Sequence, residues 1–412
     1  MAKEEKKAPK LRFNGYTNDW ERKKLGDVAN SYINGGTPDT QNKNYWIGDI
    51  PWIQSSDLKN DDIWNVNINK YITNKAVNDS AAKLIPANSI AIVTRVGVGK
   101  LAYMSQEYST SQDFLSLVDI KEDLIFIMYM LYFKISKLSS SLQGTSIKGI
   151  TKKELLNLSI SIVNNTAEQN RIGRVFKILD NSINLHERKC EELALIKKAL
   201  LQKLFPKKDE IKPEVRYENF SDAWEQRKLG EVVEMFNGDR GYNYPKDSEL
   251  ISEGIPFINA GDLKNGQIDL KNCKKISREK FNQLSGAKIR QGDILYCLRG
   301  TLGKNAIVKF NEGTVASSLV DIRPKTINGI YLFIILNSDI EYRQRILNDE
   351  GAAQPNLSVR NLAKFIIPVP KTKEQQKIGD FFNQIDTLIT LHQCKLKKLR
   401  QLKKFLLQNM FI

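Results

Sequence analysis

Apolar residues recur at alternating steps of three and four along two stretches of the chain, residues 166–205 and 372–411. This spacing places one apolar stripe along a helix and is typical of a coiled-coil seam. Because each predicted helix has a single stripe, we expect the two helices to bury these stripes against each other. The predicted helix-pair seam contains Ile172, Phe176, Leu179, Ile183, His186 and Leu193 in the first stretch, and Ile378, Phe382, Ile385, Ile389, His392 and Leu399 in the second.

Each predicted helix has some 38 residues and would be roughly 55 Å long. Thr166 with Gln169, and Thr372 with Gln375, have the spacing of a capping box, which predicts that the helices begin there. The seam is interrupted by polar residues at the same layers of both helices, His186 with His392 and Lys197 with Lys403.

His186 and His392 are the only histidines of the chain, and they allow two interpretations. A catalytic base needs a pocket and a partner within hydrogen-bond reach. A polar residue in a helix seam instead sets the register or the pairing of the helices. We favour the second interpretation, because both histidines fall on the predicted seam.

The two helices belong to a longer internal repeat. With a shift of 206 residues, 18 of the 40 positions in the two helical stretches are identical without a gap, which indicates a duplication. Looser matches precede them, such as "DWERKKLGDV" with "AWEQRKLGEV" and "IPWIQSSDLKN" with "IPFINAGDLKN". The offset drifts by a few residues between these blocks, as insertions in loops would cause. We therefore predict one unit of about 200 residues that occurs twice.

The parts before each helix have the pattern of mixed α/β domains. Short β-branched runs such as "SIAIVTR" and "DILYCLR" alternate with turn residues, while "LIFIMYMLYF" is typical of a buried helix. The run is too short to span a bilayer. The predicted domains are residues 1–155, a first helical region with its linker at 156–212, a second globular domain at 213–362, and a second helical region at 363–412.

The composition favours a polyanionic partner. The chain of 412 residues has a formal net charge of +16 and a pI near 9.4. Nucleic acid is the usual partner of such a protein, and a merely lysine-rich surface is the alternative.

The four cysteines form no CxxC pair, which suits a reducing compartment. The first ten residues have charges but no apolar core, so we expect a cytoplasmic protein rather than a secreted one.

Candidate DNA contacts come from loops that are either repeated or divergent. Arg95 with Lys100, and Arg299 with Lys304, lie beside glycines in both halves and could contact backbone phosphates. Amide and guanidinium side chains in the neighbouring loops can hydrogen-bond base edges. The repeated Asp57 and Asp262 are interpreted as turn caps. The candidates are Gln54, Ser55, Arg95, Lys100, Ser146, Lys148, Arg240, Tyr242, Asn259, Arg299, Lys304, Gln354 and Asn356.

Catalytic motifs are missing from the sequence. There is no phosphate-binding P-loop and no nucleophile elbow, and the chain has no Pro-Pro pair for an amino-methyltransferase motif. His186 and Cys190 have the spacing of a metal-ligand pair, but Leu396 replaces the cysteine in the second copy. We expect neither catalysis nor a bound metal or cofactor.

These features together resemble the specificity subunit of type I restriction–modification systems. The resemblance rests on the "WExxKLGxV" motifs at Trp20 and Trp224, "GGTP" in the first half, "EQxxI" at Glu168 and Glu374, and the "LLQxxF" helix ends. The second half has "NGDRG" in place of "GGTP".

The resemblance implies two α/β target-recognition domains, each reading one half of an asymmetric bipartite site on double-stranded DNA. It also implies that the two long helices pair as an antiparallel coiled coil with pseudo-two-fold symmetry and set the spacing. Two adenine-N6 methyltransferase subunits that use S-adenosylmethionine would dock on this scaffold, and restriction subunits that use ATP and Mg²⁺ would join them. The subunit itself would catalyse nothing and bind no membrane.

Two other functional classes remain open from the sequence. One is a duplicated DNA-binding regulator that works alone and binds its site without partners. The other is a single-chain DNA enzyme with an unrecognised motif, which would act on DNA by itself.

Overall fold

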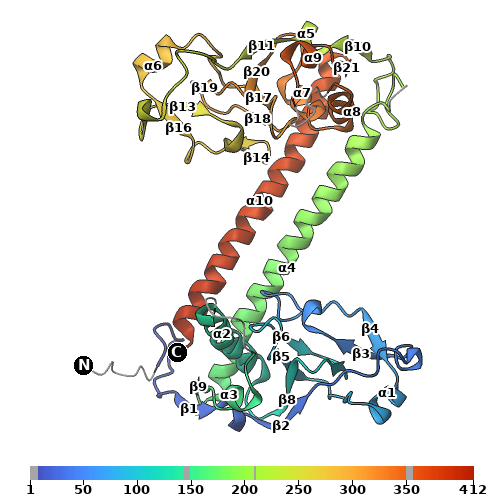
Figure 1. Cartoon of the computed structure of the whole chain (residues 1–412), viewed down its shortest axis with the longest axis vertical. Helices are drawn as coiled ribbons and strands as arrows, with labels where there is room; N and C mark the ends of the chain where they lie inside the picture. Colours follow the sequence, from blue (N-terminus) through green and yellow to red (C-terminus); the bar gives the residue numbers. More distant parts are fainter. Residues whose placement is uncertain (1–7, 143–148, 208–209, 349–355) are drawn as a thin grey trace. The chain divides into compact units, whose positions relative to one another are not determined.

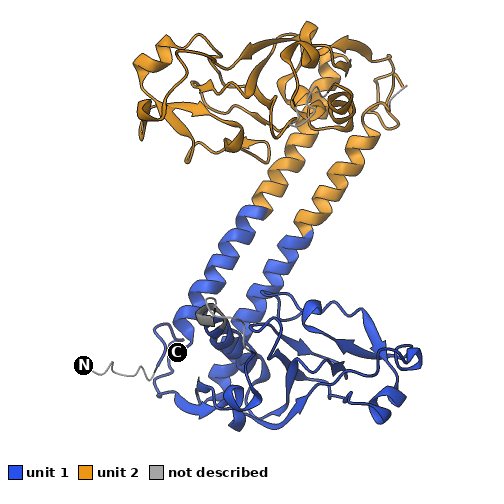
Figure 2. Cartoon of the chain, viewed as in Figure 1, with its two compact units in different colours: residues 1–188, 393–412 blue, residues 189–392 orange. Residues whose placement is uncertain are grey.

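The computed structural model describes residues 8–142, 149–207, 210–348 and 356–412. The chain forms two compact units, which Figure 2 shows in different colours. Unit 1 contains residues 1–188 and 393–412, and unit 2 contains residues 189–392. Each unit therefore combines one globular part with segments of both long helices.

The two long helices have the predicted positions. Helix α4 runs over Thr166–Lys203 and has 38 residues, and α10 runs over Thr372–Met410 and has 39 (Figure 1). Within unit 1, Asp180 of α4 pairs with Lys403 of α10, and Glu187 pairs with Arg400. The residue numbers rise along one helix as they fall along the other, so the helices pair antiparallel.

The predicted capping boxes are wrong. Thr166 and Thr372 are already the first helical residues. The amide of Gln169 donates to the Val163 carbonyl and its oxygen accepts from the backbone N–H of Asp123, so it does not turn back onto the helix start. Its copy Gln375 bonds Pro370 and Asn328 in the same way. The glutamine thus joins the long helix to the globular part of its unit.

The glutamate of the same motif has an equally structural role. Glu168 is fully buried and accepts two hydrogen bonds from the Arg12 guanidinium, at 2.6 and 2.8 Å. Glu374 accepts two from Arg216, at 2.7 and 2.8 Å. A bidentate pair of this kind is strong and geometrically specific. It fixes the segment before each globular part to the long helix.

The described residues of unit 1 form three small sheets and, besides the long-helix segments, three α-helices. The main sheet has the antiparallel order β2-β8-β5-β6, a second has the order β4-β3-β7, and β1 pairs with β9. The elements are β1 (Glu21–Lys24), β2 (Ala29–Asn34), β3 (Ile50–Ile53), β4 (Lys70–Ile72), α1 (Asn74–Asp79), β5 (Ser89–Val93), β6 (Leu101–Met104), β7 (Ser109–Thr110), β8 (Phe114–Ile120), α2 (Leu124–Leu142), α3 (Lys152–Leu156) and β9 (Ser159–Ile162).

Unit 2 repeats this plan with additions. Its main sheet has the order β11-β20-β17-β18, a second has β12-β16-β13-β19, and β10 pairs with β21 and β14 with β15. The elements are β10 (Glu225–Lys228), α5 (Leu229–Val232), β11 (Val233–Asn237), β12 (Leu250–Ile251), β13 (Ile255–Ile258), β14 (Leu263–Lys264), β15 (Gln267–Ile268), β16 (Lys274–Ile276), α6 (Arg278–Gln283), β17 (Ile294–Cys297), β18 (Asn305–Ile307), β19 (Thr314–Val315), β20 (Leu319–Pro324), α7 (Gly329–Ile335), α8 (Asp339–Leu347), α9 (Val359–Ala363) and β21 (Ile366–Val369).

Each main core receives the end of the long helix that belongs to the other sequence repeat. In unit 1, Phe411 packs against Trp20, Phe126 and Phe176 with ring centroids 5.5 to 6.3 Å apart. In unit 2, Phe205 packs against Trp224, Tyr331 and Phe382 at 5.8 to 6.4 Å. Buried aromatic pairs stabilise a core beyond the area they bury. The repeated tryptophan and the repeated helix-end phenylalanine therefore serve one packing contact.

Candidate nucleic-acid interface

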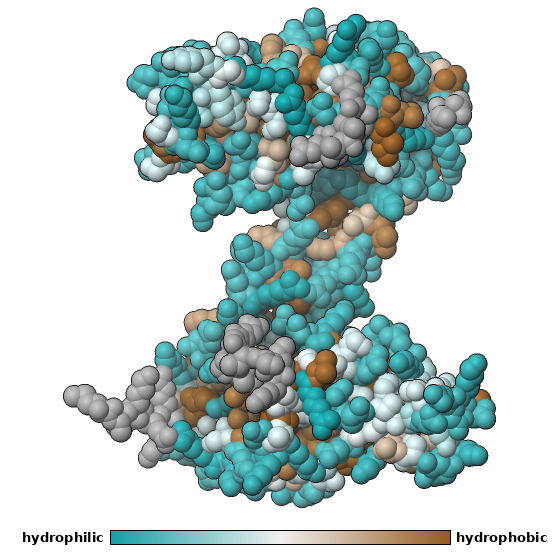
Figure 3. All heavy atoms as spheres, viewed as in Figure 1, coloured by the Kyte–Doolittle hydropathy of each residue, from teal (hydrophilic) through white to brown (hydrophobic). Residues whose placement is uncertain are grey.

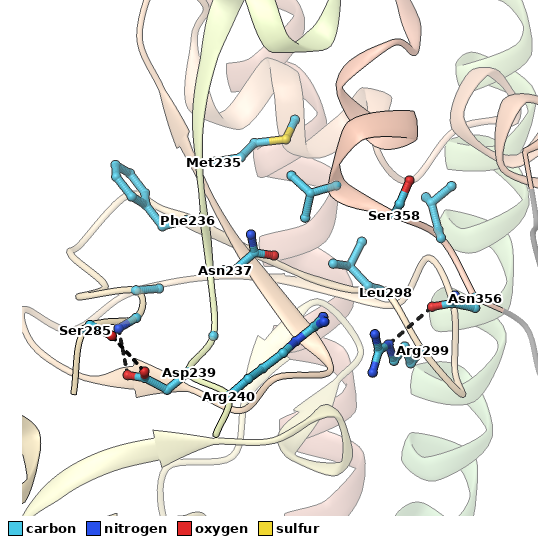
Figure 4. Close-up of a pocket in the computed structure, with 15 residues that line it drawn as sticks. Met235, Phe236, Asn237, Asp239, Arg240, Ser285, Leu298, Arg299, Asn356 and Ser358 are labelled. Carbon is cyan, nitrogen blue, oxygen red and sulfur yellow. Dashed lines mark hydrogen bonds between the residues drawn. The ribbon is translucent and has the colours of Figure 1, made fainter. Parts of the chain in front are cut away.

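Three of the predicted DNA contacts meet in one cleft of unit 2. The cleft has a volume of about 650 Å³ and is lined by Arg240, Arg299 and Asn356, among other residues. Figure 4 shows the Arg240 side chain extending into the cleft, while the Nε of Arg299 donates to Oδ1 of Asn356 at 3.2 Å. Two exposed guanidinium groups give the cleft the charge and the donors that a nucleic acid requires.

Backbone hydrogen bonds hold the loops of this cleft together. The Ala316 N–H donates to Ile258 at the end of β13, and the Leu298 N–H donates to Ser318. The loop 316–318 thus lies between the segment that leads to Asn259 and the segment that leads to Arg299. Leu357 N–H in turn donates to Leu298 and brings the start of α9 to the same place.

Unit 1 has an equivalent set of backbone hydrogen bonds between its loops. The Ser111 N–H donates to Ile53 at 2.9 Å, the Thr94 N–H to Asp113 at 2.7 Å, and the Ile150 N–H to Thr94 at 2.7 Å. These bonds bring together the loops that follow β3, β5 and β7 and the loop that precedes α3. Gln54 and Arg95, the residues after Ile53 and Thr94, begin two of these loops. Arg95 therefore lies at the place that corresponds to Arg299 in the cleft of unit 2.

Each of the two repeated lysines forms a hydrogen bond within its own unit. Lys100 Nζ donates to the Ser55 carbonyl at 2.9 Å, and Lys304 Nζ donates to the Ala260 carbonyl at 3.3 Å. Each ammonium ties the glycine-rich loop after β5 or β17 to the short 3-10 turn after β3 or β13. This is a loop-holding role, and a phosphate contact of these lysines stays a prediction.

The two repeated aspartates cap those short turns, as predicted. Asp57 Oδ2 accepts from the Gln54 N–H at 2.9 Å, and Asp262 Oδ2 accepts from the Asn259 N–H at 2.8 Å. The Gln54 and Asn259 side chains are half-buried, as is Ser55. The turn geometry is therefore the same in both units, while the side chain at its start differs.

Aromatic and basic side chains surround the sites. In unit 1, Lys70 Nζ lies 5.9 Å from the Trp46 ring and 5.4 Å from the Trp52 ring. In unit 2, Tyr242 is 97% exposed. Polar side chains cover most of the face of each globular part that Figure 3 shows. Ser146, Lys148 and Gln354 lie outside the described residues.

Two residues of unit 1 were missed from the sequence. Thr37 donates to the Gln112 side-chain oxygen at 2.6 Å, next to Ser111, whose N–H donates to the Ile53 carbonyl. In unit 2 the corresponding pair is Arg240 and Ser317, where the guanidinium donates to the Ser317 carbonyl at 3.4 Å. The change from "GGTP" to "NGDRG" signals this difference in the sequence, but only the strand pairing brings Gln112 to Thr37.

A buried acidic pair lies on the strands next to the cleft of unit 2. Asp321, opposite Phe236 in the β11–β20 ladder, is completely buried. Burial, and then the nearby Asp293 carboxylate, raises the pKa of Asp321 to about 8. Arg323 donates to Asp293 at 2.8 Å and to Asp321 at 3.4 Å, so one guanidinium contacts both carboxylates.

The predicted seam residues are all buried or half-buried. The first three of each helix belong to the core of its unit, and His186, Leu193, His392 and Leu399 are half-buried. Among the described residues, no group of three or more His, Cys, Asp or Glu side chains lies together as a metal site would require. In the same part of the chain no helix has both the length and the apolar character needed to cross a membrane.

Comparison with known proteins gives a consistent result. The family model of the type I restriction modification DNA specificity domain matches residues 17–195 and 221–401. The MjaIX specificity subunit of a type I restriction enzyme from Methanocaldococcus jannaschii is 25% identical over 409 residues, covering 95% of this chain and 92% of that one. The EcoR124I/EcoR124II specificity subunit from Escherichia coli is 34% identical over 174 residues, which is 40% of this chain and 42% of that one.

The crystal structure of a type I restriction–modification S subunit from M. genitalium has a similar fold. It matches with a TM-score of 0.66 at 18% sequence identity, over 98% of this chain and 99% of that one. Two copies of the family domain and a shared fold agree with the internal repeat.

Proposed function

The chain belongs to the type I restriction–modification DNA specificity family, and on that premise we propose how it recognises DNA. Each unit reads one half of an asymmetric bipartite site on a double helix. The observation that supports this most is the repeated construction of the loops. Equivalent backbone hydrogen bonds assemble the candidate site in both units, while the side chains of these loops differ. The same scaffold with different side chains suits two readers with different targets.

The shared arginine has a separate role in this proposal. Arg95 and Arg299 occupy the same place in the two units, at the loop after β5 and after β17. A residue that both readers keep is suited to the part of DNA that is the same everywhere, the phosphate backbone. Backbone contacts fix the position of the protein and supply affinity that falls with salt.

The two long helices would set the distance between the half-sites. They would also dock two adenine-N6 methyltransferase subunits that use S-adenosylmethionine, and the complex would take up restriction subunits that use ATP and Mg²⁺. In this assembly the chain itself performs no catalysis and holds no cofactor. The complex would work in the cytoplasm, on cellular and invading DNA.

The experiment exchanges one reader at a time in the complex with the methyltransferase. Residues 15–150 are replaced by the matching domain of a relative, and methylated adenines are mapped across a genome. We expect one half of the target to change and the other half to stay. The matched control replaces residues 219–355 and should change only the other half. A change of both halves after one exchange would disprove the model of two independent readers.

A further inference from the structure

The two units offer different side chains at one and the same place beside the repeated arginine. In unit 1 the strand pairing sets Asn34 opposite Leu115, and in unit 2 it sets Asn237 opposite Val320. Three residues after each asparagine come Thr37 and Arg240. Three residues before Leu115 and Val320 come Gln112 and Ser317. Thr37 with Gln112 and Arg240 with Ser317 therefore occupy equivalent positions.

The backbone at this place is fixed in both units. A Cβ atom on Gly35 would overlap the Ser111 carbonyl oxygen, and one on Gly238 would overlap the Ala316 carbonyl oxygen. Only glycine permits such a close approach of the turn to the neighbouring strand. The turn after β2 and the turn after β11 are thus packed directly on the loops that hold Gln112 and Ser317.

Each turn is held further by its own means. In unit 1 the Trp52 indole donates to the Gly36 carbonyl at 3.1 Å. In unit 2 the buried Asp239 carboxylate accepts from the Gly286 N–H at 2.6 Å and from the Ser285 hydroxyl at 3.1 Å. Thr37 and Arg240 follow directly on these fixed residues. A recognition group on a rigid backbone loses little conformational entropy when it binds.

The chemistry of the two pairs differs in the way that base reading requires. The Thr37 hydroxyl donates to the Gln112 oxygen, so it fixes which end of the amide is the acceptor and which is the donor. A glutamine oriented in this way can accept from N6 and donate to N7 of adenine. Arg240 is exposed and uses one donor on Ser317, so its guanidinium keeps donors for O6 and N7 of guanine.

From these contacts we infer that the Thr37–Gln112 pair and Arg240 are specificity-determining residues, the first for an adenine in one half-site and the second for a guanine in the other. The inference rests on the proposed function, because it assigns bases to the two readers. Arg95 and Arg299, identical in both units, serve as the sequence-independent contacts beside them.

The test transplants the pair of unit 1 into unit 2. The double variant Arg240→Thr/Ser317→Gln is co-expressed as the full chain with the methyltransferase, and bound fragments of a random duplex pool are sequenced. We expect the guanine preference at one position of the second half-site to fall about 10-fold or more, since it depends on a bidentate contact. The first half-site should be unchanged.

Two further variants separate the possible outcomes. Arg240→Lys keeps the charge but cannot form the planar two-donor contact, so the guanine preference should fall while overall affinity is largely kept. Arg299→Ala should lower binding to all sequences alike. Thermal unfolding of each complex shows whether a variant has folded.

Each outcome gives a decision. If the Arg240 variants bind every sequence less well and change no base preference, Arg240 is a phosphate contact and the inference is wrong. If they change nothing, the inference is also wrong, although a bipartite preference of the wild-type complex would leave the proposed function standing. If the wild-type complex selects no bipartite sequence, the proposed function itself fails.

Discussion

At the scale of single residues, the two units have different side chains at one pair of equivalent buried positions. In unit 1, Ser89, Tyr108 and Ser116 form a neutral network in which the tyrosine hydroxyl donates to Ser116 at 2.9 Å. The strand registers place Asp293 and Asp321 at the positions of the two serines in unit 2. The neutral network needs no charge partner, whereas in unit 2 burial and the nearby Asp293 carboxylate favour the protonated form of Asp321.

This difference predicts a pH dependence that Asp321→Asn removes. The pKa of Asp321 is raised from 3.8 in its ordinary state to about 8 in the fold. The folded chain therefore holds a proton that the unfolded chain releases, so this contribution to stability is full at low pH and is lost as the pH rises toward 8. The wild-type protein should lose about 1 kcal/mol of unfolding free energy per pH unit between pH 6 and 8 through this group. The asparagine variant should show a flatter profile.

The measurement is urea denaturation at several pH values from 6 to 9. Asp269→Asn is the matched control, because Asp269 is a carboxylate of the same unit whose pKa is lowered to about 2 by hydrogen bonds from Asn272 and Lys264. The control should leave the loss of stability above pH 6 unchanged. An identical pH profile for wild type and Asp321→Asn would show that Asp321 is ionised in the fold.

Residue roles were only partly predictable from the sequence. Arg95 and Arg299 stand out because they are repeated beside glycines, and the structure assembles loops around both. Gln112 gave no signal, because its partner Thr37 lies 75 residues away and only the β2–β8 pairing joins them. The glutamines of the repeated motif were misread as caps, because a capping box and a tertiary hydrogen bond require the same residue types at the same spacing.

At the scale of elements, two equivalent ion pairs join the long helices. Lys403 pairs with Asp180 at 2.6 Å in unit 1, and Lys197 pairs with Asp386 at 2.6 Å in unit 2. The side chains of the first pair are 8% and 7% exposed, those of the second 27% and 38%. Asp180 accepts additional hydrogen bonds from Tyr129 and Trp64. The same two residue types thus form a buried pair in one unit and a half-exposed pair in the other.

The two pairs should respond differently to the loss of their lysine. Lys403→Ala leaves the buried Asp180 carboxylate without its cation, and we expect a loss of about 3–5 kcal/mol in the stability of unit 1. Lys197→Ala removes a pair that water already reaches, and the loss should be about 1 kcal/mol or less. Denaturant unfolding of the full chain measures both variants under the same conditions.

A double variant checks the cause. Asp180→Asn/Lys403→Met removes both charges while the amide oxygen can still accept from Tyr129, so it should recover most of the stability lost in Lys403→Ala. Equal losses for Lys403→Ala and Lys197→Ala would mean that burial does not distinguish the pairs.

The elements themselves followed well from the sequence. The three-and-four spacing predicted both long helices, and the β-branched runs predicted β5 and β17. The pattern could not show that Phe205 and Phe411 enter the globular cores, because an apolar residue at a helix end is equally suited to the helix seam. Which surface covers it depends on tertiary contacts with Trp20 and Trp224.

At the scale of the whole molecule, the sequence repeat and the compact units divide the chain differently. The repeat has its boundary near residue 206, but unit 1 takes residues 393–412 and unit 2 begins at residue 189. Aligning the sequence with itself at a shift of 206 residues reveals the duplication. This alignment cannot show that the two copies exchange their helix ends. Each unit nevertheless has its own core and its own candidate site, which supports independent contributions to DNA binding.

Independence of the units leads to a prediction for salt dependence. If Arg95 and Arg299 each neutralise one phosphate, Arg95→Ala and Arg299→Ala should each reduce the slope of log K against log salt by about 1. The double variant should reduce it by about 2, since substitutions at distant sites without shared partners add. Base preferences should stay the same in all three variants, because the phosphate groups of DNA are the same at every base pair. Titration of a labelled target duplex with the methyltransferase complex between 50 and about 200 mM salt measures the slopes. A double variant no weaker than either single variant would mean that the two arginines depend on each other, and a changed base preference would make the arginine a base reader.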